Sequence, residues 1–202
     1  MQESLWQIDD FNDLEDCRIT LYRDHFSQIE ADRFFSLLQK IQWNQNEIIV
    51  FGKKHLEPRQ TAWYGNPGIN YSYSGIKHEA KNWIPFLEEI RESIQRTSKS
   101  TFNSVLINQY RDEKDGVAWH SDDEPELGES PTIASVSFGA TRKFQVRHKT
   151  KDGEIFSTFL NHGDLMIMHP PTQTHWIHCV PKSTKKVSER INLTFRQIFK
   201  VD

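Results

Sequence analysis

The sequence predicts an α+β fold in which two helices precede a β-rich half that forms a sandwich, jelly roll or barrel. Apolar side chains recur at helical spacing only in the first hundred of the 202 residues. After residue 100 the pattern changes to short alternating or β-branched runs separated by turn residues. The length suits a single domain. No run of about 18 apolar residues occurs, so no membrane span or membrane partner is expected.

The first helix is predicted from a capping box formed by Ser27 and Glu30, whose side chains satisfy the first free backbone amides. The second begins at Pro85, a residue favoured in the first helical turn, and continues with apolar residues at helical spacing to residue 97. The apolar residues expected on one side of the first helix are Ile29, Phe34, Leu37, Leu38 and Ile41.

Eight strands are expected after residue 100, and turn signals at Asp152-Gly153 and Gly163-Asp164 separate some of them. Short strands at this spacing, with no helical segment between them, argue against a parallel βαβ sheet. We therefore expect the chemistry to lie in this half. The strands are 103–110, 116–120, 132–138, 142–148, 154–160, 164–168, 174–180 and 189–199.

The net charge of −3 argues, as an average, against a nucleic-acid partner. Its distribution weakens that inference, because residues 1–16 carry −6 and residues 112–129 carry −7, which leaves +10 elsewhere. Either basic stretch alone is typical of a solvated face. Together they offer a surface to a phosphate backbone. The two stretches contain Arg142, Lys143, Arg147, Lys149 and Lys151, and then Lys182, Lys185 and Lys186.

The two cysteines, Cys17 and Cys179, cannot form a disulfide framework. The acidic first residues also lack the basic head and apolar stretch of a secretory signal. We therefore expect an intracellular protein of the cytoplasm, nucleoid or nucleus, not a secreted one, and a monomer.

A candidate metal site begins with His120 and Asp122, which follow the strand-like run 116–119. In an extended chain, residues i and i+2 face the same side, so the imidazole and the carboxylate converge. Two histidines and one carboxylate form a set that suits Fe(II) and leaves coordination positions open, so a second histidine is needed. The candidates are His162, His169, His175 and His178.

Spacing alone does not choose among these histidines. His169 ends its predicted strand, whereas His175 and His178 share the segment 174–180. A separation of three puts these two on opposite faces of an extended segment, so at most one points inward. Cys179 faces away from its neighbour and is expected to be a packed thiol rather than a ligand.

The last predicted strand alternates strictly between polar and apolar residues. Two guanidiniums on one inner face, with no acid between them, need anionic partners, which a dicarboxylate co-substrate supplies. Asn108 and Tyr110 form a comparable pair on an earlier strand. The alternative for this strand in isolation is the polar outer face of an antiparallel sheet. Its polar face carries Arg190, Asn192, Thr194 and Arg196.

Five motifs resemble the AlkB family of Fe(II)- and 2-oxoglutarate-dependent dioxygenases, and the resemblance is collinear from residue 48 to 199. It implies a double-stranded β-helix, or jelly roll, and Fe(II) bound by His120, Asp122 and His178. The motifs are Leu106-Ile-Asn-Gln-Tyr110, His120-Ser-Asp-Asp-Glu124, Ser135-Val-Ser-Phe-Gly139, Trp176-Ile-His178 and Arg190-Ile-Asn-Leu-Thr-Phe-Arg196.

The resemblance also implies 2-oxoglutarate and O2 as co-substrates. By motif, Asn108, Tyr110 and Arg196 surround the chelating end of 2-oxoglutarate. Arg190 binds its distal carboxylate, and Thr194 belongs to the same pocket. The implied reaction is oxidative demethylation of alkylated DNA bases, 1-methyladenine and 3-methylcytosine, preferably in duplex DNA. Its products are formaldehyde and succinate.

The segment Val50-Phe51-Gly52-Lys53 resembles the apolar finger of the family branch that works on duplex DNA. An apolar wedge in the base stack fills the gap that a flipped nucleotide leaves. The resemblance therefore implies that Phe51, Gly52 and Lys53 contact the substrate. The alternative is that Phe51 simply ends a buried strand, 48–51.

A nucleotide-recognition lid is implied by the match of Arg59, Tyr64, Tyr71, Ser72 and Tyr73 to the family. In the lid, Tyr73 stacks on the flipped base, a contact that tolerates several bases.

Asp123 and Glu124 stand at the family's lesion-reading position. N1-methyladenine and N3-methylcytosine are cationic, so a carboxylate attracts them. Without the motif, this stretch is typical of a solvated acidic loop. On the basic hairpin 142–151, Lys149 and Lys151 resemble the branch's contacts to phosphates of the opposite strand, which position DNA without reading sequence.

The expected division of the single dioxygenase domain is an N-terminal helical extension (1–47), a lid with its supporting helix (48–99) and a jelly-roll core (100–202). The alternative functions are the same chemistry on single-stranded DNA, RNA or another methylated substrate, and a lesion-binding module without turnover. The last requires a broken ligand set, yet the expected ligands are all present.

Overall fold

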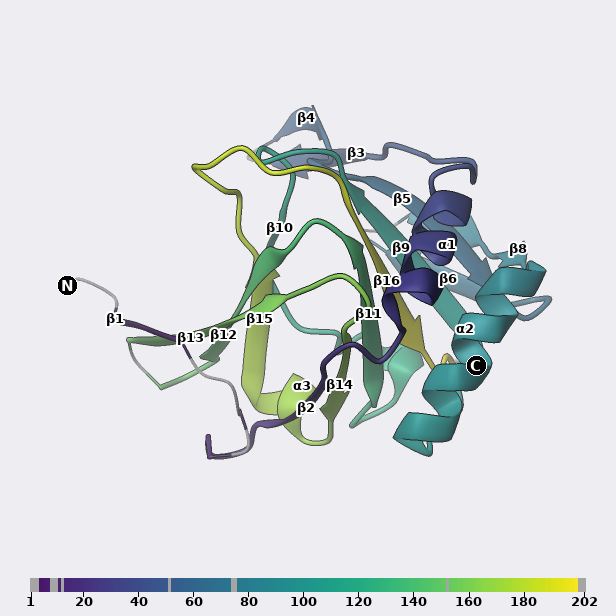
Figure 1. Ribbon diagram of the computed structural model, residues 1–202. Helices are drawn as coiled ribbons and strands as arrows, with labels where there is room; N and C mark the ends of the chain where they lie inside the picture. Colours follow the sequence, from purple (N-terminus) through teal and green to yellow (C-terminus); the bar gives the residue numbers. More distant parts are fainter. Residues whose placement is uncertain are drawn as a thin grey trace.

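Two β-sheets face each other and enclose the centre of the protein (Figure 1). The computed structural model describes residues 4–7, 11, 13–50, 52–73, 76–151 and 153–199. The larger sheet contains, in spatial order, β2 (Arg18–Tyr22), β14 (Leu165–His169), β11 (Ile133–Gly139), β16 (Arg190–Arg196), β9 (Ser104–Tyr110), β5 (Gln60–Gly65) and β8 (Lys81–Asn82). The smaller sheet contains β1 (Ser4–Gln7), β13 (Glu154–Leu160), β12 (Arg142–His148), β15 (Trp176–Val180) and β10 (Val117–His120).

Helices and two hairpins complete the fold. Helices α1 (Gln28–Leu38) and α2 (Pro85–Ser98) cover the outer face of the larger sheet (Figure 1). The hairpins are β3 (Glu47–Val50) with β4 (Lys53–Leu56), and β6 (Asn70–Tyr73) with β7 (Ile76–Glu79). The two-sheet architecture confirms the predicted jelly-roll class. None of the helices among the described residues is both long and apolar enough to cross a membrane.

All eight strands predicted after residue 100 are present within a few residues of the expected bounds, with one difference in 174–180. Residues Thr172–His175 form a short helix, α3, before β15 begins at Trp176. Two prolines precede this helix, and proline lacks the N–H that a longer strand would need. His175 therefore lies in a helix and not in the same strand as His178. The alternation of side chains along a strand, on which the sequence argument about these two histidines depended, does not apply to it.

The first half of the chain contributes more to the two sheets than the sequence predicted. β2 pairs with β14, β1 pairs in parallel with β13, and β5 pairs with β9. The expected boundaries between a helical extension (1–47), a lid (48–99) and a core therefore do not follow the sheets. The strands β1, β2 and β5 are short, which explains the difference, because short strands acquire their stability from pairing with distant partners.

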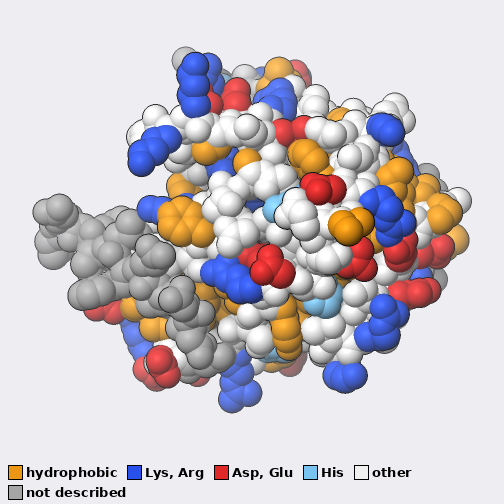
Figure 2. Space-filling model, in the orientation of Figure 1, with side chains coloured by type: hydrophobic (Ala, Val, Ile, Leu, Met, Phe, Trp, Pro, Cys, Tyr) orange, Lys and Arg blue, Asp and Glu red, His pale blue; other side chains and the backbone are white. Residues whose placement is uncertain are grey.

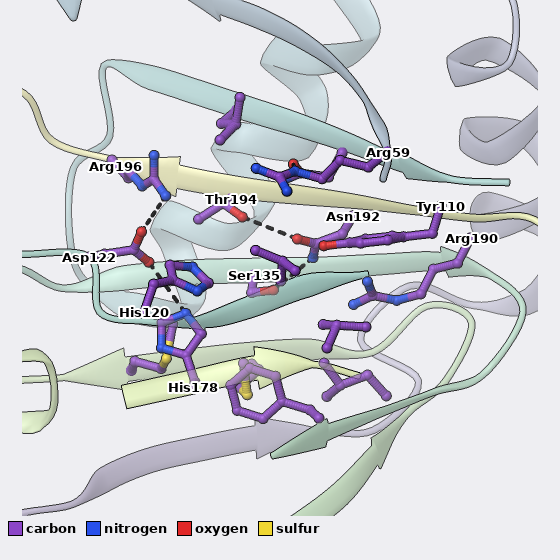
Figure 3. Close-up of a pocket in the computed structure, with 18 residues that line it drawn as sticks. Arg59, Tyr110, His120, Asp122, Ser135, His178, Arg190, Asn192, Thr194 and Arg196 are labelled. Atoms are coloured by element: carbon purple, nitrogen blue, oxygen red, sulfur yellow. Dashed lines mark hydrogen bonds and ion pairs between the residues drawn. The ribbon is translucent and has the colours of Figure 1, made fainter. Parts of the chain in front are cut away.

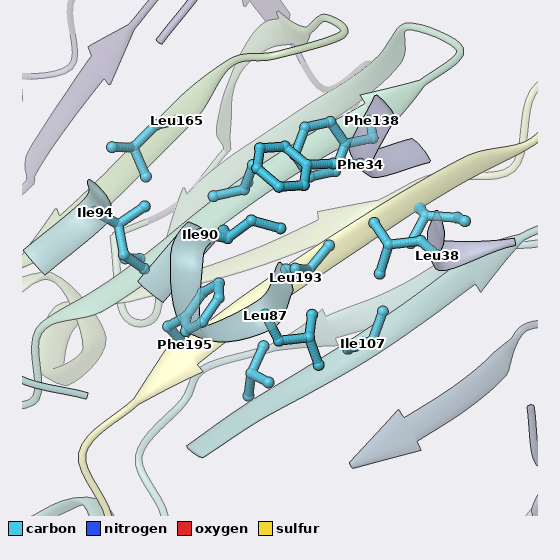
Figure 4. Close-up of a cluster of buried hydrophobic side chains, with 14 of the residues drawn as sticks. Phe34, Leu38, Leu87, Ile90, Ile94, Ile107, Phe138, Leu165, Leu193 and Phe195 are labelled. Carbon is cyan, nitrogen blue, oxygen red and sulfur yellow. The ribbon is translucent and has the colours of Figure 1, made fainter. Parts of the chain in front are cut away.

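The apolar stripe of α1 packs with α2 on the larger sheet (Figure 4). The capping box is confirmed, because Ser27 Oγ accepts from the Glu30 amide and the Glu30 carboxylate accepts from the Ser27 amide. Ile29, however, is 83% exposed. Each residue turns a helix by about 100°, which places Ile29 about 160° from the buried Ala31 and corrects the predicted apolar face. The buried residues of the two helices are Ala31, Phe34, Leu38, Leu87, Ile90 and Ile94.

We expect Phe34→Ala to lower the free energy of unfolding by about 3–5 kcal/mol, because its ring is buried against Phe26 and Phe138 and its loss leaves a cavity. Ile29→Ala, on the same helix but exposed, is expected to change it by less than about 0.5 kcal/mol. Urea unfolding followed by circular dichroism measures both values. Equal effects of the two substitutions would contradict the packing described here.

A second apolar cluster lies between the two sheets and surrounds the polar pocket described below. It includes Tyr110, Phe144, Met166 and Met168. Cys17 and Cys179 are both buried, and burial raises the pKa of each thiol to about 12. The Cys179 thiol also donates to Gln145 Oε1 at 3.6 Å. Both cysteines are packed thiols, as expected for Cys179.

Candidate metal and co-substrate site

The centre of the site is β16, in the middle of the larger sheet. Its seven residues are all buried, so a polar outer face, the alternative for this strand, is wrong. The odd-numbered residues Ile191, Leu193 and Phe195 pack in the cluster beneath the helices. Neighbouring β9 aligns Asn108 with Asn192 and Tyr110 with Arg190. The polar residues facing the smaller sheet are Arg190, Asn192, Thr194 and Arg196.

One pocket between the sheets brings all eight predicted metal and co-substrate residues together (Figure 3). The histidines and the aspartate lie at one end, and Tyr110 and Arg190 at the other (Figure 3). Its remaining polar lining comes from Arg59, Ser135 and Asn192. The eight predicted residues are Asn108, Tyr110, His120, Asp122, His178, Arg190, Thr194 and Arg196.

The three predicted metal ligands converge although they come from two strands and a loop. β10 pairs with β15 so that His120 stands directly opposite His178. Their ring centroids are 4.3 Å apart, and His178 Nε2 lies 3.8 Å from Asp122 Oδ2 (Figure 3). Within the part of the chain that the structure describes, no group of three or more His, Cys, Asp or Glu residues reaches complete metal-binding geometry. The three side chains therefore lie close together, but their donor atoms are not at the distances of a bound metal ion.

The protonation of the three side chains fits a divalent metal. Burial and the neighbouring His120 lower the pKa of His178 to about 3, so its imidazole is neutral and carries a free lone pair. His120 Nδ1 lies 2.8 Å from the Ala118 carbonyl. Since a carbonyl only accepts, the proton belongs on Nδ1 and Nε2 is left to bind a metal. Two imidazoles and a carboxylate are the donor set that suits Fe(II).

Asp122 is ionised and fixed in place. Burial by itself raises its pKa, but the charge of the Arg196 guanidinium and its hydrogen bond to the carboxylate outweigh burial and hold the pKa below its usual value. Arg196 Nη2 and Asp122 Oδ1 form a buried ion pair, and the Asp122 amide donates to Gln173 Oε1 at 2.8 Å. The sequence prediction that both arginines depend on a co-substrate for an anion needs correction, because Asp122 supplies the anion of Arg196.

Arg190 remains without such an anion. Its side chain is 1% exposed, and Nη2 donates to Ser137 Oγ at 2.8 Å. Nε and Nη1 are buried and have no hydrogen-bond partner among the described residues. Burial lowers the pKa of Arg190 to about 10, which still leaves it charged at neutral pH. A buried cation with two unused donors is suited to the carboxylate of a small anionic ligand, so the residues present fit 2-oxoglutarate.

The other three candidate histidines lie outside the pocket. His162 Nδ1 accepts from the Gly139 amide at 2.8 Å. His169 Nε2 lies 3.3 Å from Thr20 Oγ1. The His175 ring stacks on the His148 ring, with the ring centroids 6.1 Å apart. The described structure therefore brings His178, rather than these histidines, to the other two ligands.

The predicted substrate residues are distributed unevenly. Arg59 lines the pocket, where it donates to Asn108 Oδ1 and Glu57 Oε1, each at 3.0 Å. Tyr64, by contrast, is packed in the core beneath the helices, which corrects its expected place in the lid. Gly52 is exposed with φ of +75° in the turn of the β3–β4 hairpin. Phe51 lies outside the described residues, and the side chains of Lys53, Tyr71, Ser72 and Tyr73 lie outside the description as well.

The acidic and basic residues beside the ligands form a network. Lys149 Nζ donates to Asp123 Oδ2 at 2.9 Å and to the Gln173 carbonyl at 2.8 Å. Burial raises the pKa of Asp123, but the bonds from Lys149 and Ser121 outweigh it and lower the pKa below its usual value. Lys151 instead pairs with Glu15 on the surface.

Sequence reasoning did not identify Gln173, which holds the Asp122 amide and the Lys149 ammonium from α3. It also missed the role of Arg142, whose guanidinium donates to three backbone carbonyls, those of Asp112, Asp115 and Pro181. No sequence signal identifies either residue, because both act on segments that are distant in the chain. They fix the loops that flank β10 and β15.

Comparison with known families gives a match to the 2OG-Fe(II) oxygenase superfamily over residues 18–196. The chain is similar to "DNA oxidative demethylase ALKBH2" of Mus musculus (42% identity over 86% of this chain and 77% of the relative) and of Homo sapiens (42% over 91% and 73%). It is also similar to "Alpha-ketoglutarate-dependent dioxygenase alkB homolog 3" of Mus musculus, with 43% identity over 90% of this chain and 66% of the relative.

Among solved structures, "The structure of OsALKBH1" matches with a TM-score of 0.63 at 18% identity, over 89% of this chain and 97% of that one. At this identity the likeness concerns the fold alone. It agrees with the two facing sheets.

Proposed function

This chain belongs to the 2OG-Fe(II) oxygenase superfamily and, within it, to the AlkB family, and from that premise we propose that it is a DNA repair enzyme that demethylates alkylated bases oxidatively. It is an Fe(II)- and 2-oxoglutarate-dependent dioxygenase. The observation that carries the proposal is the convergence of all eight predicted metal and co-substrate residues on one pocket. The proposed substrates are 1-methyladenine and 3-methylcytosine, with O2 as the second co-substrate and formaldehyde and succinate as products.

His120, Asp122 and His178 would hold the iron, and Arg190 the distal carboxylate of 2-oxoglutarate, with Asn108, Tyr110, Thr194 and Arg196 around the rest of it. Bound Fe(II) and 2-oxoglutarate supply the activation of O2 for oxidation of an N-methyl group. The chain's own contribution is positioning. Arg196 fixes the Asp122 carboxylate, and side chains of the apolar cluster between the sheets, among them Phe144 and Met168, line the pocket.

The test uses the protein with Fe(II), ascorbate, 2-oxoglutarate and an oligonucleotide containing 1-methyladenine, in single-stranded and duplex form. Formaldehyde release and the mass of the base are followed. We expect demethylation, with one succinate formed for each methyl group removed. Absence of demethylation in both forms would refute the proposed function, and 2-oxoglutarate turnover without base repair would point to another methylated substrate.

We propose that the substrate is preferably duplex DNA, and the charge distribution supports contact with a nucleic-acid backbone. The beginning of the first basic stretch and the whole of the second, apart in the sequence, line one groove that contains Lys143, Lys182, Lys185 and Lys186. Arg142 in the same groove is tied to backbone carbonyls and so fixes its wall. Basic side chains also project around the outline of the face in Figure 2, with acidic ones between them. Ammonium groups along a groove bind phosphates without reading sequence, and we propose that Lys151 adds to this contact.

Phe51→Ala tests the wedge. We expect the variant to lose about tenfold or more of its activity on duplex substrate. Flipping a base out of the duplex costs about a few kcal/mol of unstacking, and an apolar side chain that fills the gap offsets part of this cost. Activity on single strands should stay within about twofold of the parent, since there is no duplex stack to fill. The matched control is Leu56→Ala, an exposed apolar residue at the other end of the β3–β4 hairpin. Equal losses of Phe51→Ala on both substrates would remove the wedge from the proposal.

Two alternatives make different predictions. An enzyme for single-stranded DNA or RNA would show no dependence on Phe51. A lesion-binding module without turnover would bind alkylated DNA but release no formaldehyde. The intact set of ligands and the unused donors of Arg190 favour turnover.

A further inference from the structure

The two acidic residues that follow Asp122 differ in how their charges are compensated. Asp123 Oδ2 accepts from Lys149 Nζ at 2.9 Å and from Ser121 Oγ at 2.7 Å. Glu124 Oε2 is buried and has no hydrogen-bond partner in the described part of the chain. An ammonium group therefore offsets the charge of Asp123, whereas no such bond reaches Glu124 Oε2.

Hydrogen bonds fix both the side-chain ammonium and the backbone amide of Lys149. Its Nζ donates to the Gln173 carbonyl at 2.8 Å as well as to Asp123, and its backbone amide donates to the His175 carbonyl at 2.8 Å. Its side chain is 27% exposed, against 55% for Lys151, whose partner Glu15 is itself exposed. Two protein oxygens thus occupy two of the three donors of Lys149, which leaves it less suited than Lys151 to gripping a phosphate.

We propose that Lys149 is a specificity-determining residue, which offsets the charge of Asp123 and so reduces the enzyme's preference for cationic over neutral alkylated bases. The inference rests on the proposed function. A cationic base beside Asp123 is attracted by the carboxylate and repelled by the adjacent ammonium, so the two effects largely cancel. A neutral base feels neither charge to the same degree. Electrostatic selectivity then depends on Glu124 and on whatever part of the Asp123 charge Lys149 leaves uncompensated.

The test compares Lys149→Gln with the parent protein on single-stranded oligonucleotides that carry one alkylated base. The cationic bases are 1-methyladenine and 3-methylcytosine, and the neutral ones are 1-methylguanine and 3-methylthymine. We expect the ratio of kcat/KM for cationic over neutral bases to rise about fivefold, the size of effect that removal of one unit charge from a partly exposed site produces. Dissociation constants measured by fluorescence anisotropy without O2, with Fe(II) and 2-oxoglutarate present, should show the same change in ratio.

Lys151→Gln is the matched control, since it removes the same charge from the same hairpin without touching Asp123. We expect it to leave the ratio unchanged while it weakens binding of all four oligonucleotides alike. In an Asp123→Asn background the Lys149 ammonium is left uncompensated and repels a cationic base, so this variant should have a lower ratio than the parent, and adding Lys149→Gln should raise the ratio again.

A uniform loss on all four bases, equal to that of Lys151→Gln, would overturn the inference and return Lys149 to the role of a phosphate contact. An Asp123→Asn variant whose ratio equals that of the parent would overturn it as well, because the base would then not respond to this charge pair. If the parent protein repairs none of the bases, the proposed function fails instead, so the two failures are distinguishable.

Discussion

Replacement of His178 by alanine is expected to reduce Fe(II) affinity by more than about 100-fold and to abolish demethylation. Loss of a residue that merely supports a metal ligand costs about 10–100-fold, so loss of a ligand should cost more. His178 is buried opposite His120, and burial keeps its ring neutral and able to bind a metal. Its removal leaves one imidazole and one carboxylate, which do not hold a catalytic ion. Isothermal titration with Fe(II) under anaerobic conditions measures the affinity directly.

His175→Ala is the matched control, because His175 lies three residues earlier and its ring stacks on His148 outside the pocket. We expect it to bind Fe(II) and to demethylate as the parent does. Thermal unfolding of both variants separates loss of metal from loss of fold. A His178→Ala protein that binds Fe(II) like the parent would show that this assignment of the second histidine is wrong.

Replacement of Arg190 by methionine is expected to raise the KM for 2-oxoglutarate by about 100-fold or more. Charge-assisted hydrogen bonds contribute about 1.5–3 kcal/mol each, and Arg190 has two buried donors that no described residue uses. At saturating 2-oxoglutarate, kcat should fall much less, because the lost contact binds the co-substrate equally before and during the reaction. Steady-state kinetics at varied 2-oxoglutarate measures both constants.

Arg142→Met provides the control for this substitution. Both guanidiniums lie over the Tyr110 ring, at 5.2 Å for Arg190 and 5.5 Å for Arg142. Arg142, however, donates to three backbone carbonyls, so its loss should lower the unfolding free energy and leave the KM for 2-oxoglutarate unchanged. An equal rise of the KM in both variants would mean that the binding of the co-substrate carboxylate is not specific to Arg190.

The fold was predictable where the pattern is local. The capping box at Ser27, the helix from Pro85 and the alternation of β16 depend on residues a few positions apart, and all three are present. The strands β1, β2 and β5 were not predicted, because each is short and becomes stable only by pairing with a strand far along the chain. The prediction that Ile29 lies on the buried side of the first helix was wrong, because its side chain is exposed. A short helix has too few apolar residues to define its buried side from the sequence.

The residues of the site were predictable in type but not in their contacts. Sequence reasoning placed Arg190 and Arg196 on one inner face, which the structure bears out. It could not tell that Asp122 satisfies one of them, that Asp123 occupies Lys149, or that Gln173 fixes the Asp122 amide. These partners come from separate strands and loops, and their distances depend on how the two sheets face each other.

By itself, the sequence determined the helices, the strand alternation and the chemical types of the site residues, because near neighbours in the chain set periodicity and capping. The tertiary structure alone decided how the convergent charges pair. Arg196 has an anion within the protein and Arg190 has none for its two free donors, while Lys149 faces Asp123. The reason is physical: a buried charge must find its partner through space, and pairing of distant strands decides which partner is near.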